Sequence, residues 1–532
     1  PGSLLGTILD VDVTLQITQQ PSDQVGVVPS PGIPFKVEDF NATDGTFTVE
    51  TVGDVAGPWV YDQAAGNWRA DNGNDGCGTP QNSALITPEL TLAQSGALTL
   101  SFNHRYSFEP EYDGGQVRVS VNGGAFATVP PEAFRQNGYA TALIVGTGIM
   151  NNKRGFNGNS AGYASGDFVT SVASLGTFKQ GDKIKVEFIG AWDECSIGTV
   201  PNWVIDSMRI DLLPMIIQDF AANNGNYTVE TVGTVPEPWA YNATQGAWIA
   251  NSGNDACGAP GNSSLKSPAY TVPQDDEVTL SFRHRYSFEG DYWDGGQVRI
   301  SVNGGPFTAV TADKFIANGY QAGTIQGTGV LMGERAFNGD SAGYAAGTLI
   351  TSSAVLGTFK QGDTIVVAFV GAWDECSRAS VPSWVVKDVS LSFGKAAQAS
   401  TFSVAGTATL HGDPLALSYQ WQRNDGAGFV DIAGANGATY TIYPTANDLA
   451  ATFRAIVSAP GASVTSSTAK LTSSAPPPTI AVATVAGKAS ITFTGRLQSS
   501  ATVDGTYTDV QNATNPYTPA GTDQMRFYKS VR

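Results

Sequence analysis

The sequence has 532 residues, of which only 14% are charged, and it contains 61 glycines. This length is enough for several domains. A chain poor in charge and rich in glycine suits short strands joined by tight turns better than long helices. The formal net charge of −18 argues against a nucleic-acid partner, because phosphate binding needs clustered Lys and Arg. No apolar run is long enough to cross a bilayer.

Residues 1–36 contain a strand-like alternation of Val11, Val13, Leu15 and Ile17. Two interpretations of this segment are open. It is either the last strand of a preceding immunoglobulin-like domain, so that the sequence is a fragment, or a donor strand that completes a neighbouring subunit's sheet. The second interpretation predicts a homopolymer, such as a fibre or surface layer.

Residues 37–214 and 215–394 repeat each other. The blocks TVETVG, HRYSFE, DGGQVR and GAWDECS each occur twice, offset by 180 or 181 residues. Repeats of this length are domains rather than units of a short-period solenoid. Alternating apolar residues over 97–102 and 116–121 predict strands, and Asn-Gly at 122–123 predicts a hairpin turn. The sequence therefore predicts an all-β fold with two tandem jelly-roll sandwiches.

Two further modules follow the repeats. Residues 395–475 contain the motif Tyr419-Gln420-Trp421, which is similar to the strand-C tryptophan of immunoglobulin-like domains and implies a third sandwich. The prolines at 476–478 predict a stiff linker. Residues 479–532 are expected to form a small β-module.

Each repeat resembles the jelly-roll, adhesin-type modules of secreted bacterial proteases and surface proteins, a group related to MAM-like domains. The resemblance rests on an early Asp-Phe pair, the block DGGQVRVSVNGG and a closing strand beginning at Trp203. The stretch LQSSATVDGTYTDV and the final FYKSVR resemble C-terminal modules of exported Verrucomicrobia and Planctomycetes proteins. These resemblances imply a secreted or cell-surface bacterial adhesin that binds a glycan or a protein surface.

The four cysteines fall two per repeat and permit three pairings. The duplication favours Cys77 with Cys195 and Cys257 with Cys376. Each bridge would close a loop of about 118 residues and add roughly 4–5 kcal/mol in the chain-entropy model. Such bridges imply an oxidising compartment. The alternative is four buried thiols in a cytosolic protein.

Crowded carboxylates predict structural Ca²⁺, a cation that prefers six to eight oxygen ligands. In related jelly rolls a calcium ion joins the N-terminal strand to the closing strand, which implies Glu38 or Asp39 with Asp206 here. In the second repeat Lys387 replaces Asp206, which argues against calcium there. The alternatives are loop capping and a glycosidase carboxylate pair. The candidate calcium ligands are Glu38, Asp39, Glu109, Asp113, Asp193, Asp206, Asp219, Glu289, Asp294, Asp374 and Asp388.

Aromatic residues in glycine-rich and acidic loops are candidates for glycan binding, because sugar C–H faces stack on flat rings. The alternative is that these rings fill the sandwich cores. The candidates are Trp59, Tyr61, Trp68, Tyr112, Trp239, Tyr241, Trp248, Tyr292 and Trp293.

His104 and Tyr106 lie on one face of a predicted strand. Such a pair resembles the acid/base groups of jelly-roll polysaccharide lyases. The alternative is a histidine hydrogen-bonded inside the sandwich. The sequence contains no nucleophile elbow, HExxH motif or P-loop. We therefore expect no catalytic residue, and an enzyme, either a polysaccharide lyase or a glycosidase, is the alternative.

Overall fold

The computed structural model describes residues 13–71, 79–195, 198–252, 259–376, 378–473 and parts of 480–531. Among these residues the secondary structure is almost entirely β, with five short 3-10 turns and no α-helix. The described residues divide into two compact units, one within Pro29–Ala396 and one drawn from both ends of the chain. Within the described residues, no helix is long and apolar enough to span a membrane.

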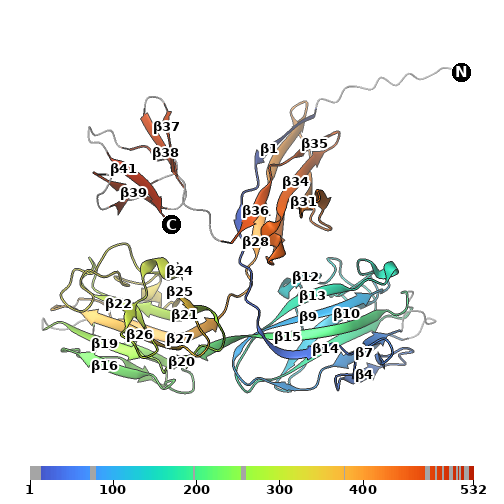
Figure 1. The fold of residues 1–532 in the computed structure, drawn as a ribbon, viewed down its shortest axis with the longest axis horizontal. Helices are drawn as coiled ribbons and strands as arrows, with labels where there is room; N and C mark the ends of the chain where they lie inside the picture. The colour runs from blue at the N-terminus through green and yellow to red at the C-terminus, as the bar shows by residue number, and fades with distance from the viewer. Residues whose placement is uncertain are drawn as a thin grey trace. The chain divides into compact units, whose positions relative to one another are not determined.

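The first repeat is a sandwich of two antiparallel sheets (Figure 1). One sheet has the order β11-β10-β14-β7-β4, and β8 pairs with β14. Its strands are β4 (Thr48–Val52), β7 (Gln81–Ile86), β8 (Leu90–Thr91), β10 (Gly114–Val121), β11 (Ala127–Thr128) and β14 (Lys183–Trp192). The opposite sheet contains β3 (Ile33–Glu38), β5 (Val60–Asp62), β6 (Asn67–Ala70), β9 (Gly96–Tyr106), β12 (Phe134–Gln136), β13 (Val169–Phe178) and β15 (Trp203–Gln218), with the turns η1 (Pro131–Ala133) and η2 (Tyr163–Ser165).

The second repeat has the same two-sheet arrangement, as the sequence duplication predicts. One sheet has the order β16-β19-β26-β22-β23, and β20 pairs with β26. Its strands are β16 (Thr228–Val232), β19 (Gly261–Lys266), β20 (Tyr270–Thr271), β22 (Gly295–Val302), β23 (Thr308–Ala309) and β26 (Thr364–Trp373). The opposite sheet contains β17 (Ala240–Asn242), β18 (Ala247–Ala250), β21 (Asp276–Tyr286), β24 (Phe315–Ala317), β25 (Ile350–Phe359) and β27 (Trp384–Phe393), with the turns η3 (Ala312–Lys314) and η4 (Tyr344–Ala346).

One long strand belongs to both repeats. The first part of β15 pairs with β9 and β3 and closes the first sandwich. Its last residues, Met215–Gln218, pair with β27 and take the place in the second sandwich that β3 has in the first. The predicted boundary between residues 214 and 215 therefore falls inside a continuous strand.

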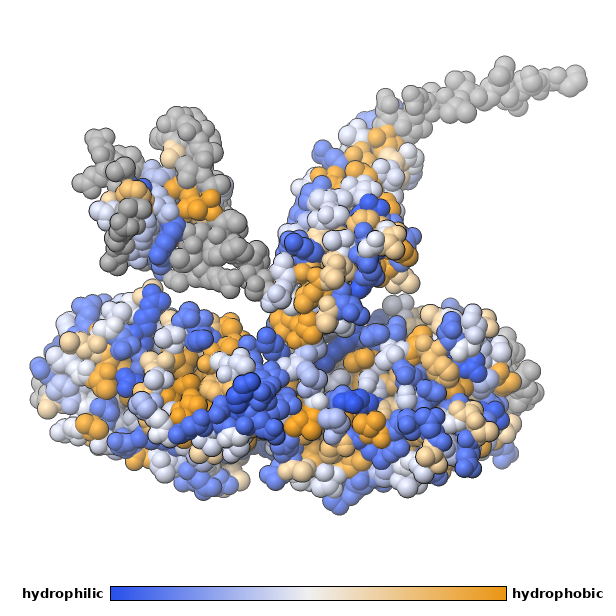
Figure 2. Space-filling model, in the orientation of Figure 1, coloured by the Kyte–Doolittle hydropathy of each residue, from blue (hydrophilic) through white to orange (hydrophobic). Residues whose placement is uncertain are grey.

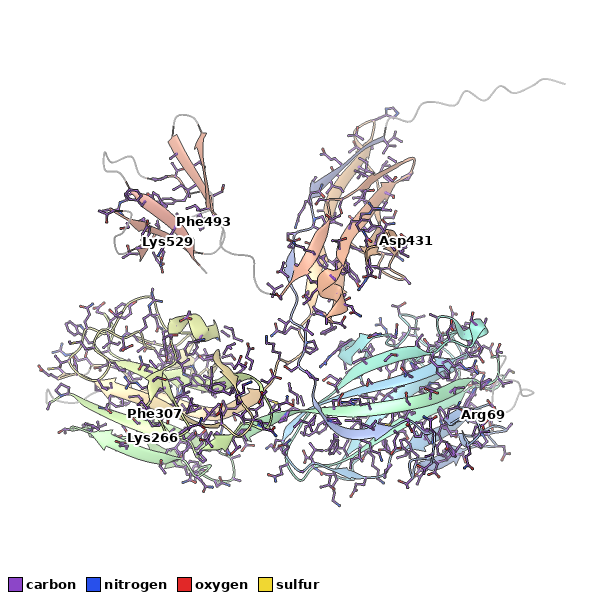
Figure 3. The ribbon with its side chains drawn as sticks, viewed as in Figure 1. Arg69, Lys266, Phe307, Asp431, Phe493 and Lys529 are labelled. Carbon is purple, nitrogen blue, oxygen red and sulfur yellow. The ribbon has the colours of Figure 1, made fainter. Side chains whose placement is uncertain are left out.

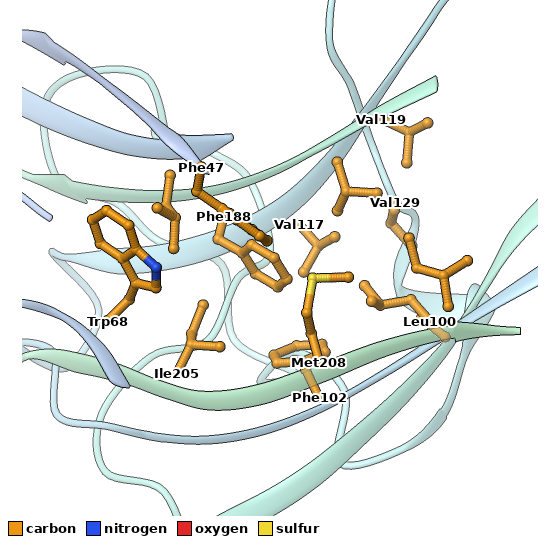
Figure 4. Packing of buried hydrophobic residues seen from close by; sticks show 14 of the residues in the cluster. Phe47, Trp68, Leu100, Phe102, Val117, Val119, Val129, Phe188, Ile205 and Met208 are labelled. Atoms are coloured by element: carbon orange, nitrogen blue, oxygen red, sulfur yellow. The ribbon is translucent and has the colours of Figure 1, made fainter. Parts of the chain in front are cut away.

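The core of the first sandwich lies between its two sheets. Leu98, Leu100 and Phe102 of β9 alternate with outward-facing residues and are almost fully buried, which is the pattern of a strand with one buried face. They pack with Val117, Phe188 and other residues in one cluster (Figure 4). The second sandwich has a matching cluster.

The immunoglobulin-like sandwich is assembled from both ends of the chain. Val13–Gln19 (β1) pairs antiparallel with Ala405–Leu410 (β29), and β2 pairs parallel with β36. The predicted separate role of residues 1–36, whether as part of a preceding domain or as a donor strand for another subunit, is therefore wrong for β1. The other strands are β2 (Gln24–Val25), β28 (Ser400–Ser403), β30 (Asp413–Pro414), β31 (Ser418–Asn424), β32 (Phe429–Asp431), β33 (Thr439–Ile442), β34 (Thr452–Ala459), β35 (Ala462–Thr465) and β36 (Ala469–Thr472), with the turn η5 (Asn447–Ala450).

The C-terminal segment is also β. Its strands form a two-stranded sheet and a three-stranded sheet with the order β40-β39-β41. They are β37 (Ile480–Val485), β38 (Lys488–Phe493), β39 (Arg496–Ser500), β40 (Thr508–Asp509) and β41 (Phe527–Val531).

Candidate functional site

Each sandwich has a loop end where a short acidic loop meets a long loop. In the first repeat this end, here called tip 1, consists of residues 109–113 and 143–157. The Asn157 side-chain amide donates to the carbonyl oxygens of Glu109 (3.2 Å) and Asp113 (2.6 Å) and so joins the two loops. Tip 2 consists of residues 289–294 and 324–338. Its two loops are joined in the same way, because the Asn338 side-chain amide donates to the carbonyl oxygens of Glu289 and Asp294.

A close backbone approach also joins the two loops of tip 1. The N–H of Val145 donates to the Glu111 carbonyl at 2.6 Å. A Cβ on Gly146 would lie only 2.1 Å from the Tyr112 carbonyl oxygen, so the contact requires glycine. Gly327 has the same relation to the Trp293 carbonyl in tip 2. Both tips are therefore braced.

The most buried of the predicted calcium ligands cap backbone N–H groups. Asp113 and Asp294 are fully buried, and each accepts a 2.8 Å hydrogen bond, from the N–H of Asp193 and of Asp374 respectively. Asp193 in turn accepts from the N–H of Cys195 at 3.0 Å. These contacts agree with the alternative interpretation, in which the carboxylates cap loops, because short acidic side chains accept hydrogen bonds from backbone N–H groups in tight turns.

Other predicted calcium ligands are paired with cations or peptide groups. Asp219 pairs with Lys179 at 2.5 Å, and Asp388 pairs with Arg283. Glu38 pairs with Lys36, while Glu289 accepts from the N–H of Arg378 at 2.9 Å. Within the described residues, no group of three or more His, Cys, Asp or Glu side chains is placed to hold a metal ion.

One remaining acidic pair differs between the repeats. Burial raises the pKa of Asp206, and the nearby negative charge of Asp39 raises it further. In the second repeat Lys387 takes the place of Asp206, and its ammonium donates to the carbonyl oxygens of Gln245 and Gly246. A positive charge thus occupies in the second repeat a position that is negative in the first.

Four of the nine predicted aromatic ligand residues are core residues. Trp59, Trp68, Trp239 and Trp248 are buried, with 2–5% of their surface exposed, so their predicted contact with a glycan is wrong. The Trp59 indole donates to the Ser83 carbonyl at 3.1 Å. Large rings contribute most when buried, provided that the indole N–H finds a partner.

The remaining aromatic candidates reach solvent to different extents. Tyr61 and Tyr241 are half-buried, and each hydroxyl donates to a backbone carbonyl, of Phe40 and of Phe220. Tyr292 is also half-buried. Tyr112 and Trp293 are exposed, at 45% and 43%, and both lie in the tips.

Four further exposed apolar residues in the tips were not predicted from the sequence. Leu143 and Val145 lie in tip 1 with 49% and 52% of their surface exposed, and Val330 and Met332 lie in tip 2 with 42% and 64%. The sequence does contain a feature that could have indicated their exposure, because these residues stand in glycine-rich stretches without the apolar–polar alternation of a strand. Figure 2 shows hydrophobic residues interspersed with hydrophilic ones on the visible face.

His104 lies inside the first sandwich and is fully buried. Its Nδ1 accepts from the Trp203 indole N–H at 3.0 Å, so the proton is on Nε2, which donates to the Ser171 hydroxyl at 2.7 Å. The Ser171 hydroxyl in turn donates to the Asn137 carbonyl oxygen. Desolvation lowers the pKa of His104 to about 3. The predicted hydrogen-bonded histidine is confirmed, and the proposed acid/base pairing with Tyr106 is wrong because His104 has no access to solvent.

The cysteines of the described residues are Cys195 and Cys376, and neither is a free thiol. Their predicted partners, Cys77 and Cys257, lie outside the described residues. The pairing within each repeat therefore stays a prediction.

The comparisons with known proteins name no family. No protein-family model and no curated protein matches the sequence. The adhesin domain of Epf from Streptococcus pyogenes is 9% identical, and the match covers 50% of this chain and all of that one at a TM-score of 0.16. The C-terminal domain of the Streptococcus pyogenes antigen I/II-family protein AspA is 10% identical, with coverage of 75% and 99% and a TM-score of 0.13. Similarities this low carry no argument about function.

Proposed function

We propose that this chain is a non-catalytic extracellular binding protein that attaches to a macromolecular or cell surface through tip 1 and tip 2. The observation that carries the proposal is the exposure of large apolar side chains on loops that are internally braced. Tyr112, Leu143 and Val145 are exposed in tip 1, and Trp293 and Met332 in tip 2. Apolar side chains that gather in one patch of the surface are characteristic of interaction sites, and the exposed residues of each tip stand on two loops that are joined to one another.

The bracing of the tips favours binding. A loop that is already ordered loses little conformational freedom when a partner docks, so more of the interaction energy appears as affinity. The buried carboxylates of Asp113 and Asp294 and the amides of Asn157 and Asn338 supply this order. Aromatic residues such as Tyr112 and Trp293 are also enriched among the residues that dominate binding energies.

Replacing the two exposed aromatic residues tests the proposal. We expect the Tyr112→Ala/Trp293→Ala double variant to lose at least about tenfold in affinity for cells or matrix, since a total loss of about 1.4 kcal/mol already corresponds to tenfold. Binding of the full chain to immobilised cells can be measured by flow cytometry. The control is Val52→Ala/Val232→Ala, which truncates two apolar residues of β4 and β16 that are even more exposed, at 63% and 56%. Equal binding by both variants would contradict the proposal.

Calcium stays part of the proposal for the first repeat alone. The carboxylates of Asp39 and Asp206 are the oxygen donors that a hard cation prefers, and Lys387 supplies its own positive charge at the matching place in the second repeat. Asp39 and Asp206 would hold the ion. Its positive charge would offset the repulsion that raises the pKa of Asp206.

Melting of the full chain with and without calcium tests this site. Calcium at a hundredfold excess over its Kd should stabilise the first repeat by about 2.7 kcal/mol. We expect Asp206→Lys to abolish this effect and Asp388→Asn to retain it, and differential scanning calorimetry in CaCl₂ against EGTA measures both. A calcium effect that survives Asp206→Lys would exclude this site.

A further inference from the structure

The second repeat carries a cavity of about 560 Å³ on the hairpin formed by β17 and β18. This volume is within the range of pockets that hold small ligands. Ala240 and Ile249 are cross-strand partners on this hairpin, and both are accessible at the surface. Asn242, Asn251 and Glu237 also line the cavity.

The first repeat fills the corresponding place with a charged cluster. Arg69, labelled in Figure 3, is the counterpart of Ile249. Its guanidinium lies 3.4 Å from the Asp62 carboxylate and 3.4 Å from the Asp71 carboxylate. Asp62 and Asp71 are the counterparts of Asn242 and Asn251, and Val60 is the counterpart of Ala240. Compared with the first repeat, this hairpin lacks one cation, two anions and two methyl groups. The second repeat therefore has, in place of an ion-pair cluster, a cavity whose lining includes one charged side chain, Glu237.

The cavity presents amide groups that can bind a ligand. The side-chain Oδ1 of Asn242 accepts a hydrogen bond from the Gln245 backbone N–H at 3.0 Å, which orients the side-chain NH₂ group and leaves its two donors available. The Asn251 backbone N–H is held by the Glu237 carbonyl at 3.1 Å. The Asn251 side-chain amide has no hydrogen-bond partner in the part of the chain that is described.

We propose that this cavity, whose lining residues lie outside tip 1 and tip 2, binds a neutral saccharide and so adds a second binding site to the proposed surface attachment. Asparagine amides pair with sugar hydroxyl groups as both donor and acceptor, while Ala240 and Ile249 offer apolar surface to sugar C–H groups. Among the lining residues Glu237 is the single charged side chain. An anionic sugar is disfavoured, because none of the described lining residues is a cation that could pair with it and Glu237 would repel it.

Rebuilding the charged cluster of the first repeat in the second tests the assignment. The variant Asn242→Asp/Ile249→Arg/Asn251→Asp places a set of side chains that the first repeat already accommodates in the same register. Saturation-transfer NMR on the full chain would use cellobiose, maltose, lactose and N,N′-diacetylchitobiose as probes, with sialyllactose as the acidic comparison. We expect at least one neutral probe to bind, and the variant to lose at least tenfold in affinity.

The matched control is the reciprocal change in the first repeat, Asp62→Asn/Arg69→Ile/Asp71→Asn, which should leave binding at the second repeat intact. Binding of no neutral probe, or equal binding by the rebuilt variant, overturns the saccharide assignment. The surface-attachment assay separates the two proposals. A chain that attaches to cells but binds no neutral probe refutes only the saccharide assignment, and a chain that binds one through this cavity but attaches to nothing refutes only the proposed function.

Discussion

Acidification from pH 6.5 to pH 3 is expected to destabilise both jelly-roll repeats through one buried histidine in each. Desolvation lowers the pKa values of His104 and His284 to about 3 in the folded chain, against 6.5 for an exposed histidine. Between these values the unfolded chain binds a proton that the folded chain does not, so stability falls as the pH falls. A pKa difference of about 3.5 corresponds to about 5 kcal/mol per repeat at 1.36 kcal/mol per unit.

The hydrogen-bond network explains why these histidines resist protonation. A proton on Nδ1 of His104 would face the indole N–H of Trp203, which is a donor without acceptor capacity. His284 is held in the same way, by Trp384 at 3.1 Å and by the Ser352 hydroxyl at 2.7 Å. Protonation therefore costs both desolvation and a broken hydrogen bond.

The variant His104→Gln isolates this contribution. Glutamine does not titrate, so the first repeat should lose the histidine component of its pH dependence while the second repeat retains it as an internal control. Hydrogen-exchange mass spectrometry, corrected for the pH dependence of intrinsic exchange, follows peptides of each repeat separately. A first repeat whose stability falls as steeply with pH in the variant as in the native chain would rule out His104 as the titrating group.

Local patterns predicted the strands of the repeats well because each pattern acts over a few residues. The alternation over 97–102 and 116–121 lies within β9 and β10, and Asn122 and Gly123 have the positive φ that the hairpin turn requires. Because the second repeat contains the same sequence blocks, the same strands and turn were predicted there. Side-chain periodicity also separates buried from exposed positions once the strands are known.

The sites were harder to predict because they depend on contacts that sequence spacing does not record. Trp59 and Trp68 stand in a glycine-rich stretch typical of loops, yet they lie on or beside strands whose inward face fills the core. Asp113 and Asp193 are 80 residues apart, and only the folded loops show that one caps the other. The partner of β1 lies nearly 400 residues away, beyond the reach of any local pattern.

Charged substitutions on the inward face of β1 are expected to destabilise the immunoglobulin-like sandwich and to leave the stability of both jelly-roll repeats unchanged. Leu15 and Ile17 pack against the cluster that contains Trp421 and Phe453. The double variant Leu15→Asp/Ile17→Asp removes these contacts and places two carboxylates against apolar surface. We expect a loss of at least about 3 kcal/mol, a large part of the 5–15 kcal/mol that typically stabilises a domain.

The alternating face of the same strand supplies the control. Thr14 and Thr18 are exposed, so Thr14→Asp/Thr18→Asp adds the same charge without entering the core, and it should leave exchange protection over residues 400–472 almost unchanged. Equal protection in both variants would show that β1 contributes nothing to this sandwich. Pairing of β1 within its own chain also predicts that protection is independent of protein concentration, whereas a strand donated to another subunit would lose protection on dilution. A Cβ on Gly406 would lie 2.9 Å from the Gln16 carbonyl oxygen, so β29 is built for the close approach of a neighbouring strand at this position.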